Sequence, residues 1–437
     1  EYEKITSQLI AEAQIGGAAV EKSHNRIQSD EQRVVIDLGN DNFECVEITK
    51  DGIEIKTLDE NSPILLRYQT THSQVKPVYD QADSIKEFSE LLNFKDTQLF
   101  SVHLVAMFLA DITTPIMALT GVAGSQKTTT SAAIKRIVDP SGDSLEANVL
   151  SISTKRDDII MTMYNRYLTV FENVSRIDTD TSDILCRAVT GSSNIKRAHY
   201  KNLEEIIMTF KRKIILNGVT PKFNNGDLQT RLIKYAKKEK EEINFLTDSE
   251  FEEKFVELRP RVLGQVFEVI QRVLGRIDGY TITAKTRMAE FERWGELISQ
   301  ELGYTENSFG EIYEEKMKIT SIENKDSYPI ISIIEKIMEN KREHVDSVSN
   351  LFTDIKNQAI KNGVDVYEKY VSFPKAANQL IDKMTDVGNI FDNLGIGFKV
   401  WQNTDTNNFS KNVKLIKITN KNLPPVQTKM NESDARK

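Results

Sequence analysis

The stretch that decides the fold runs from residue 115 to residue 128 and reads Pro-Ile-Met-Ala-Leu-Thr-Gly-Val-Ala-Gly-Ser-Gln-Lys-Thr. Its first five residues are an apolar run that predicts a buried strand, and residues 129–138 have the apolar periodicity of a helix. A glycine-containing loop with a Lys-Thr pair between a strand and a helix is the context of a phosphate-binding loop. Backbone N–H groups and the helix N-terminus cradle the phosphates in such a loop. The sequence therefore predicts that this protein binds a nucleoside triphosphate and hydrolyses it.

Each residue of the loop has an expected role. Lys127 is expected to reach the β- and γ-phosphates of ATP, and the Thr128 hydroxyl is expected to ligate Mg²⁺. Gln126 stands where the motif usually has glycine, so we expect its side chain to point away from the phosphates. The candidate nucleotide-binding residues are Gly121, Val122, Ala123, Gly124, Ser125, Gln126, Lys127, Thr128 and Thr129.

Two further apolar runs end in polar residues. Residues 167–171 lead into Glu172 and Asn173. Glu172 is expected to hold Mg²⁺ through water, and Asn173 is expected to help orient the attacking water. The alternative is that both are ordinary polar residues at the end of a strand. Residues 213–216 lead into Asn217, and this strand is predicted to lie beside the strand of the phosphate loop. Asn217 would then contact the γ-phosphate or the attacking water. The alternative is that Asn217 only forms a turn. Arg231 follows, and it could stabilise transition-state charge in its own chain or across a subunit boundary, or form a surface ion pair.

Composition bounds the remaining possibilities. The 437-residue chain carries a net charge of −8. Residues 1–80 hold 15 acidic against 8 basic residues, whereas residues 399–429 hold six lysines and one acid, so a basic segment near the C-terminus is available for phosphates. Two distant cysteines exclude a disulfide framework, and no apolar run approaches the length of a membrane span. These features predict a cytoplasmic protein that does not enter a membrane.

Hydrophobic patterning predicts the organisation of the chain. We expect a helix over residues 1–25, antiparallel strands at 34–38, 43–48 and 53–55, and a helix over 84–109 before the phosphate-loop strand. Strands and helices then alternate to about residue 240, which is typical of a parallel sheet. After residue 328 three helical patterns precede strands at 397–401 and 413–419, the order of a winged helix. The predicted fold is α/β. Its segments are a small acidic α+β domain (1–82), an ATPase core (83–240), a helical lid (241–325), a winged-helix domain (326–420) and a disordered tail (421–437).

The order of the motifs resembles the phage- and plasmid-encoded AAA+ ATPases related to superfamily 3 helicases, which include the C-terminal halves of viral and plasmid primase-helicases. The resemblance rests on residues 120–129 (Thr-Gly-Val-Ala-Gly-Ser-Gln-Lys-Thr-Thr), 171–175 (Phe-Glu-Asn-Val-Ser), 215–218 (Ile-Leu-Asn-Gly) and 227–231 (Asp-Leu-Gln-Thr-Arg), and it spans about residues 85–420. It implies a ring, expected to be a hexamer, with nucleotide bound between subunits. It assigns the metal-binding carboxylate to Glu172, where relatives have Asp, the sensor role to Asn217 and the arginine role to Arg231.

Basic residues suggest two DNA contacts. In superfamily 3 enzymes, to which the chain is similar, the region before the sensor strand forms a hairpin in the ring channel. Its candidate DNA-binding residues here are Lys196, Arg197, His199, Tyr200 and Lys201. A solvated charged turn is the alternative. In a winged helix, residues 374–386 would form the recognition helix and 398–413 the wing, although such domains also mediate protein contacts. The candidate phosphate contacts there are Lys375, Lys383, Lys399, Lys411 and Lys414.

Together these expectations describe an ATP- and Mg²⁺-dependent DNA motor, a replicative helicase of a virus, phage or plasmid that acts on single-stranded or forked DNA. A primase or another replication protein is a candidate partner. The first alternative is a nucleotide-gated DNA-binding or assembly ATPase with weak hydrolysis and no unwinding, which Gln126 and Glu172 favour. The second is a small-molecule kinase, which would be a compact monomer.

Overall fold

The computed structural model describes residues 22–121, 126–144, 146–197, 205–218, 222–223, 226–238, 246–323, 328–367, 373–404 and 412–424. Within these residues no helix combines the length and the apolar character that crossing a membrane requires. Most of the helix predicted for residues 1–25 lies outside the described residues. Its last part is wrong, because Ser23–Asn25 is a short strand, β1, which pairs in parallel with β6 (Ile64–Leu66).

The acidic N-terminal segment folds as a four-stranded antiparallel sheet in the order β2-β3-β4-β5. The three predicted strands are present as β3 (Arg33–Asp37), β4 (Glu44–Thr49) and β5 (Gly52–Thr57), and β2 (Ile27–Ser29) was missed. Both faces of this sheet are partly covered, because Val35 and Cys45 are buried on one face. On the other face lie Val34, Ile36, Val46 and Ile48, which are fully or almost fully buried. These side chains join the same hydrophobic core as the residues that follow.

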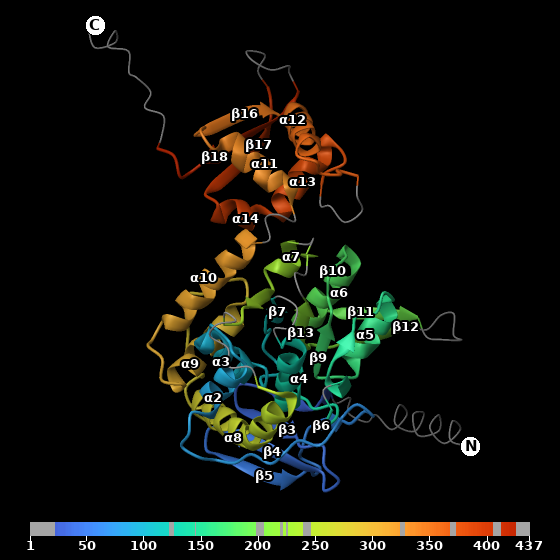
Figure 1. The fold of residues 1–437 in the computed structure, drawn as a ribbon, viewed down its shortest axis with the longest axis vertical. Coiled ribbons are helices and arrows are strands. Elements are labelled where there is room, and N and C mark those ends of the chain that lie inside the picture. The colour runs from blue at the N-terminus through green and yellow to red at the C-terminus, as the bar shows by residue number, and fades with distance from the viewer. Residues whose placement is uncertain are drawn as a thin grey trace.

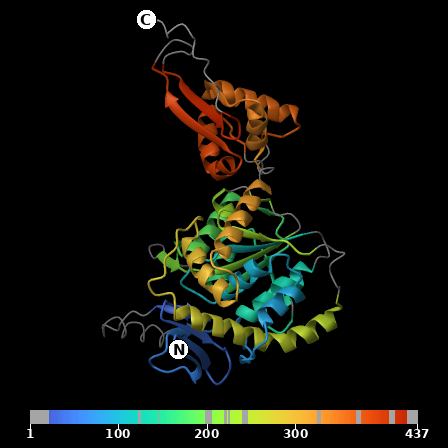
Figure 2. The same cartoon turned by 90° about the vertical axis from the view of Figure 1, so that its left-hand side faces the viewer.

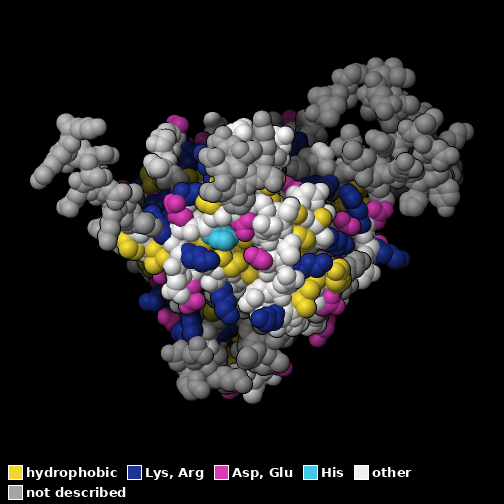
Figure 3. All heavy atoms as spheres, turned by 90° about the horizontal axis from the view of Figure 1, so that it is seen from above, with side chains coloured by type: hydrophobic (Ala, Val, Ile, Leu, Met, Phe, Trp, Pro, Cys, Tyr) yellow, Lys and Arg dark blue, Asp and Glu magenta, His cyan; other side chains and the backbone are white. Residues whose placement is uncertain are grey.

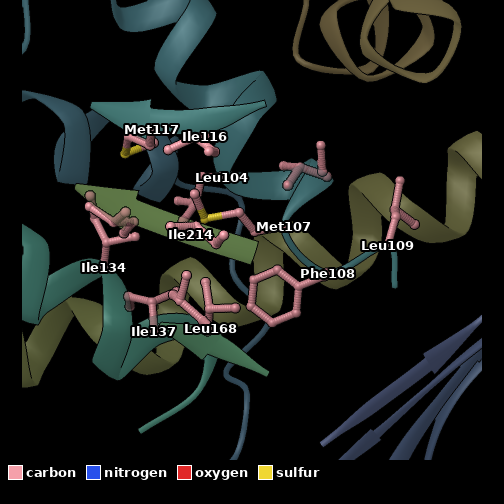
Figure 4. Close-up of a cluster of buried hydrophobic side chains, with 14 of the residues drawn as sticks. Leu104, Met107, Phe108, Leu109, Ile116, Met117, Ile134, Ile137, Leu168 and Ile214 are labelled. Atoms are coloured by element: carbon pink, nitrogen blue, oxygen red, sulfur yellow. The ribbon is translucent and has the colours of Figure 1, made fainter. Parts of the chain in front are cut away.

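A five-stranded parallel sheet forms the centre of the molecule. Its order is β15-β7-β13-β9-β8, and the strands are β7 (Ile116–Thr120), β8 (Leu150–Ser151), β9 (Leu168–Glu172), β13 (Lys213–Gly218) and β15 (Leu232–Tyr235). The prediction that the 213–216 strand lies beside the phosphate-loop strand is confirmed. The strands read as continuous apolar runs because helices cover both faces of the sheet. Figure 4 shows one such packing layer, with Ile214 of β13 between Ile134 and Ile137 of α4 (Lys127–Val138) and Leu104 of α3 (Thr97–Ala106).

The remaining helices of this part pack around the sheet. The helix predicted over 84–109 is two helices, α2 (Ser84–Leu91) and α3, because Asn93 adopts a left-handed backbone with φ of 56° and turns the chain. Helices α5 (Arg156–Tyr164) and α6 (Thr179–Thr190) follow β8 and β9. The predicted helical region contains α8 (Asp248–Leu274), α9 (Ala289–Glu301) and α10 (Ser308–Glu323). Helix α8 runs between the central sheet and the N-terminal sheet (Figure 2), and its action as a lid stays a prediction.

A buried carboxylate ties the N-terminal segment to the core. Asp139, just after α4, accepts hydrogen bonds from Arg26 Nε (3.1 Å), Lys135 Nζ (2.6 Å) and the backbone N–H groups of Tyr167 (3.1 Å) and Leu168 (3.0 Å). Burial alone would raise the pKa of Asp139, but the two neighbouring cations outweigh it and hold that pKa below its usual value. One side chain therefore connects the end of α4, the start of β9 and the N-terminal segment.

The C-terminal residues form a separate unit beyond the end of α10 (Figure 1). Its elements are α11 (Pro329–Met338), β16 (Glu343–Ser347), α12 (Val348–Lys361), α13 (Ala377–Asp386), α14 (Gly388–Asn393), β17 (Ile396–Gln402) and β18 (Lys414–Asn420). The predicted strand pair is present as β17 and β18, and β16 adds a strand that was missed, giving an antiparallel sheet in the order β16-β18-β17. The unit has its own hydrophobic core, whereas buried residues from all earlier segments share one core.

Candidate nucleotide site

Parallel pairing brings most of the predicted nucleotide-site residues to one edge of the sheet. Gly218 of β13 lies opposite Thr120 of β7, and Leu216 of β13 lies opposite Phe171 of β9. The residues that follow these strands therefore meet at their carboxyl ends, where open α/β sheets bind ligands. This edge holds the described loop residues, together with the predicted Glu172, Asn173 and Asn217.

Lys127 and Thr128 open helix α4 at this edge. Lys127 Nζ donates a hydrogen bond to the carbonyl of Gly121 (2.9 Å), and partial burial lowers the pKa of this lysine. Thr128 Oγ1 lies 3.5 Å from Glu172 Oε2 at the tip of β9. Thr129 is half-buried in the first turn of the helix, and the predicted contacts at Val122, Ala123, Gly124 and Ser125 lie outside the described residues.

Gln126 occupies the position before the lysine with a left-handed backbone, φ 56° and ψ 29°. Glycine adopts this conformation freely, whereas any other residue meets a steric cost of roughly 1–2 kcal/mol. The sequence predicts that the Gln126 side chain points away from the phosphates. The structure adds a backbone reason for the glycine that motifs of this kind usually have, because the turn into α4 requires a positive φ.

Asn217 connects the three elements that meet at this edge. Its Oδ1 accepts a hydrogen bond from the Asn173 N–H (3.1 Å), and its Nδ2 donates to Ser131 Oγ (3.0 Å). Ser131 in turn donates to the carbonyl of Thr128 (3.0 Å). Asn217 is only 2% exposed, so its amide links the first turn of α4 with the tips of β9 and β13. Asn173 follows β9 with a left-handed φ of 54° and an exposed side chain.

Arg231 lies at the amino ends of the parallel strands, whereas the predicted nucleotide site lies at their carboxyl ends. It precedes β15, and its carbonyl accepts a hydrogen bond from the N–H of Ile116, the first residue of β7 (2.7 Å). At about 3.3 Å per residue, the five residues of β7 separate it from the phosphate loop by roughly 16 Å. Its guanidinium is largely buried and pairs with Asp227, which also pairs with Arg287. This separation favours an action across a subunit boundary over an action on the nucleotide of the same chain, and both alternatives stay predictions.

Oxygen atoms at the carboxyl edge suit a magnesium ion. Mg²⁺ prefers oxygen ligands and keeps several waters, so a hydroxyl and a single carboxylate form an adequate protein contribution. Thr128 and Glu172 supply these groups on adjacent elements. In the part of the chain that the structure describes, no group of three or more His, Cys, Asp or Glu side chains could hold another metal ion.

The predicted channel hairpin is partly described. Lys196 and Arg197 belong to β11 (Ser193–Arg197), which pairs antiparallel with β12 (Glu205–Thr209), so the backbone of a hairpin is present. His199, Tyr200 and Lys201 lie outside the described residues. The basic residues after the hairpin have structural contacts, since Lys213 is buried and donates to the carbonyls of Leu109 (2.7 Å) and Ile112 (3.0 Å).

The C-terminal lysines differ in their surroundings. Lys375, Lys399 and Lys414 are exposed, Lys383 pairs with Asp386 at 3.5 Å, and Lys411 lies outside the described residues. The face of the molecule seen from above mixes basic, acidic and apolar side chains rather than forming one basic patch (Figure 3). Trp401 of β17, 37% exposed, was not predicted, although strand alternation places it on the same face as Lys399.

One family model matches the chain, and several solved structures are distantly similar to it. Residues 85–304, half of the chain, match the model of a family described as actinomycete integrative conjugative element replication protein. No curated protein matches the chain in sequence. A solved structure titled "SCCmec type IV Cch - active helicase" is 11% identical, with a TM-score of 0.45 over 96% of this chain and 83% of that chain. The C-terminal region of NrS-1 is 12% identical, with a TM-score of 0.33 over 87% and 96%. The JCV helicase is 14% identical, with a TM-score of 0.24 over 54% and 64%.

Proposed function

Because the chain belongs to the family of actinomycete integrative conjugative element replication proteins, we propose that it is a DNA motor of the AAA+ type, related to superfamily 3 helicases, that hydrolyses ATP during replication of a mobile element. The family description supports a role in replication. The motor activity, the use of ATP with Mg²⁺ and the unwinding of DNA are our inference from the site.

One observation carries the proposal: Lys127, Thr128 and Glu172 lie together at the carboxyl edge of a parallel sheet, with Thr128 Oγ1 3.5 Å from Glu172 Oε2. Lys127 is able to neutralise phosphate charge, and the hydroxyl and carboxylate would hold Mg²⁺. The metal, when bound, supplies charge neutralisation at the transferred phosphoryl group. Asn217 fixes the backbone of Asn173 through its side-chain amide, which keeps the tip of β9 in place beside the loop.

The position of Arg231 supports an oligomer. A guanidinium at the amino ends of the strands is better placed to reach a triphosphate in a neighbouring copy, which is the arrangement of a ring with sites at subunit interfaces. We propose a hexameric ring that encircles DNA, with the β11–β12 hairpin facing the channel. We also propose that residues 326–420 form a winged helix that contacts DNA through Lys375, Lys399 and Lys414. A cytoplasmic location and a primase partner belong to the same proposal.

The test is an ATPase assay with and without single-stranded DNA, together with strand separation of a forked duplex. We expect DNA-stimulated hydrolysis and unwinding, and background activity for Lys127→Ala. Lys86→Ala, at an exposed position of α2, is the matched control and should behave like the parent. Unchanged hydrolysis by Lys127→Ala would contradict the site assignment.

A second candidate is a nucleotide-gated DNA-binding ATPase with weak hydrolysis. The ion pair between Arg231 and Asp227 favours it, because the guanidinium must leave a carboxylate before it can serve a neighbouring site. Glu172, one methylene longer than the Asp of relatives, points the same way. Tight ATP binding and ring assembly without DNA-stimulated turnover would select this function. A monomer by light scattering would instead favour a small-molecule kinase.

A further inference from the structure

A cavity of about 90 Å³ lies at the amino edge of the central sheet, away from the nucleotide site. Its wall includes Thr209 and Phe210, where the β11–β12 hairpin ends, and Tyr164 at the end of α5. A single water needs roughly 10–15 Å³ of such space, so the cavity has room for a group of several heavy atoms. It therefore lies where a ligand running along the hairpin would reach the body of the protein.

Arg212 brings a positive charge to this cavity, and the carboxylate that raises its pKa, Asp139, acts from beyond salt-bridge distance. Its guanidinium donates to the carbonyls of Met163 (2.8 Å), Lys211 (2.9 Å) and Tyr164 (3.0 Å), and burial lowers the pKa of this arginine to about 10. Among the described residues no carboxylate lies within salt-bridge distance of it. Carbonyls satisfy its N–H groups but do not neutralise its charge, and a partly buried charge is stabilised by an ion of opposite sign.

The neighbouring side chains strengthen the positive potential. Lys22 and Lys211 also line the cavity, and the one carboxylate there, Asp111, lies 3.8 Å from Lys22 Nζ. Lys211 Nζ donates to the backbone carbonyl of Asp111. Burial lowers the pKa of His24, so this lining imidazole is neutral near pH 7. The lining therefore has three cations, Lys22, Lys211 and Arg212, and one carboxylate, Asp111, which gives it a net charge of +2.

Aromatic rings complete the lining beside these cations. The Phe210 ring lies 5.0 Å from the Arg212 guanidinium and packs edge-on against Tyr164 at 5.9 Å between centroids. Cations next to aromatic rings are the combination with which proteins hold a single nucleic-acid strand, since the cations contact phosphates and the rings offer apolar faces. The cavity thus matches a phosphate attached to a sugar better than a free metal or an acidic side chain.

We propose that this cavity binds a backbone phosphate of the DNA strand that passes along the β11–β12 hairpin. The proposal rests on the DNA-motor function given above and adds a contact at the base of the hairpin. Lys22 and Lys211 contact the phosphate directly, and Arg212 supplies the fixed charge behind them.

The test measures binding of a fluorescein-labelled oligothymidylate to the full chain by anisotropy over a range of salt concentrations. The slope of log affinity against log salt changes by about 0.7 for each phosphate contact to single-stranded DNA. We expect Lys22→Met with Lys211→Met to reduce the magnitude of the slope by about 0.7, and Asp111→Asn to strengthen binding. Lys86→Met, on exposed α2, should leave the slope unchanged. A slope equal to the parent's in the double variant would overturn the proposal.

Two further measurements separate this proposal from the proposed function. Binding of a fluorescent ATP analogue should be the same in all these variants, which shows that they are folded. If the parent binds the analogue but no oligothymidylate, both the DNA motor and this cavity contact are refuted. If inorganic phosphate raises the melting temperature of the parent but not of the double variant, while the DNA slopes agree, the cavity is a site for free phosphate and the DNA assignment is wrong.

Discussion

Replacing Asn217 by leucine tests the network that joins the nucleotide site. The asparagine amide accepts from the Asn173 N–H at 3.1 Å and donates to Ser131 Oγ at 3.0 Å. Leucine has a similar size and no polar atom, so Asn217→Leu removes both hydrogen bonds with little change of shape.

The expected cost follows from the groups that remain. The Ser131 hydroxyl still donates to the Thr128 carbonyl and loses only the hydrogen bond that it accepted from Asn217 Nδ2. The Asn173 N–H loses its acceptor. A hydrogen bond contributes about 1 kcal/mol and an unsatisfied buried donor costs about 1–3 kcal/mol, so we expect the free energy of unfolding to fall by about 2–4 kcal/mol.

Thr169→Val is the matched control. Thr169 lies on the adjacent strand β9 and is fully buried, and its hydroxyl has no hydrogen-bond partner within the described structure. Valine replaces it without loss of a bond, so we expect an unchanged or slightly higher free energy of unfolding. Urea unfolding followed by circular dichroism, without nucleotide, compares both variants with the parent. If Asn217→Leu unfolds at the same urea concentration as Thr169→Val, the network does not stabilise the site and the reasoning fails.

Three other changes have defined outcomes. Gly218→Ala should lower the free energy of unfolding by about 1–3 kcal/mol or more, because a Cβ there would lie 2.1 Å from the carbonyl oxygen of Val174. Gly52→Ala is the control and should not destabilise the protein, because the space around Gly52 is open. Equal melting temperatures of the two variants would contradict this. Burial lowers the pKa of His103 to about 3, so its contribution to stability is complete above about pH 6.5 and is lost as the pH falls toward 3. His103→Gln should flatten the urea midpoint between pH 7 and 5, and an unaltered profile would refute this. Because the folded protein holds the pKa of Asp139 below its usual value, ionised Asp139 stabilises the fold above about pH 3.9, and this contribution is lost as the pH falls further. Asp139→Asn should therefore lower the free energy of unfolding at pH 7, and the difference from the parent should become smaller near pH 3.

The nucleotide edge could be predicted because its signals are local. A strand, a glycine loop and a helix follow one another in sequence, and a polar residue at the end of a buried strand is visible without knowledge of its neighbours. Asn217 was predicted beside the phosphate-loop strand on motif order, and the pairing of β13 with β7 confirms it. The break at Asn93 was missed, since a single asparagine with positive φ gives little periodic signal.

The rest depends on relations across the chain. For Arg231 the sequence left open an action in its own chain, an action across a subunit boundary and a surface ion pair, because the order of the strands sets its distance from the loop and residue spacing does not reveal that order. Lys211, Arg212 and Lys213 are consecutive basic residues, yet Lys213 is buried under carbonyls and the other two line a cavity. Strands as short as β8, with two residues, are too brief for a period-two pattern to register.

The contacts of helix α4 limit which parts of the proposed motor can move relative to one another. Its first turn is held to β9 and β13 through Ser131 and Asn217, and Asp139 at its end binds the start of β9. Arg26 binds the same carboxylate and also donates to the carbonyls of His72 (2.7 Å) and Pro140 (3.1 Å).

Breaking a buried pair of this kind costs about 3–5 kcal/mol, so the N-terminal sheet, α4 and β9 move as one body. The acidic N-terminal sheet therefore shares the hydrophobic core of the central sheet and is joined to it by a buried ion pair. If the chain is the motor proposed above, we expect nucleotide-driven motion between neighbouring copies, where Arg231 would leave Asp227, or between this body and the C-terminal unit with its separate core.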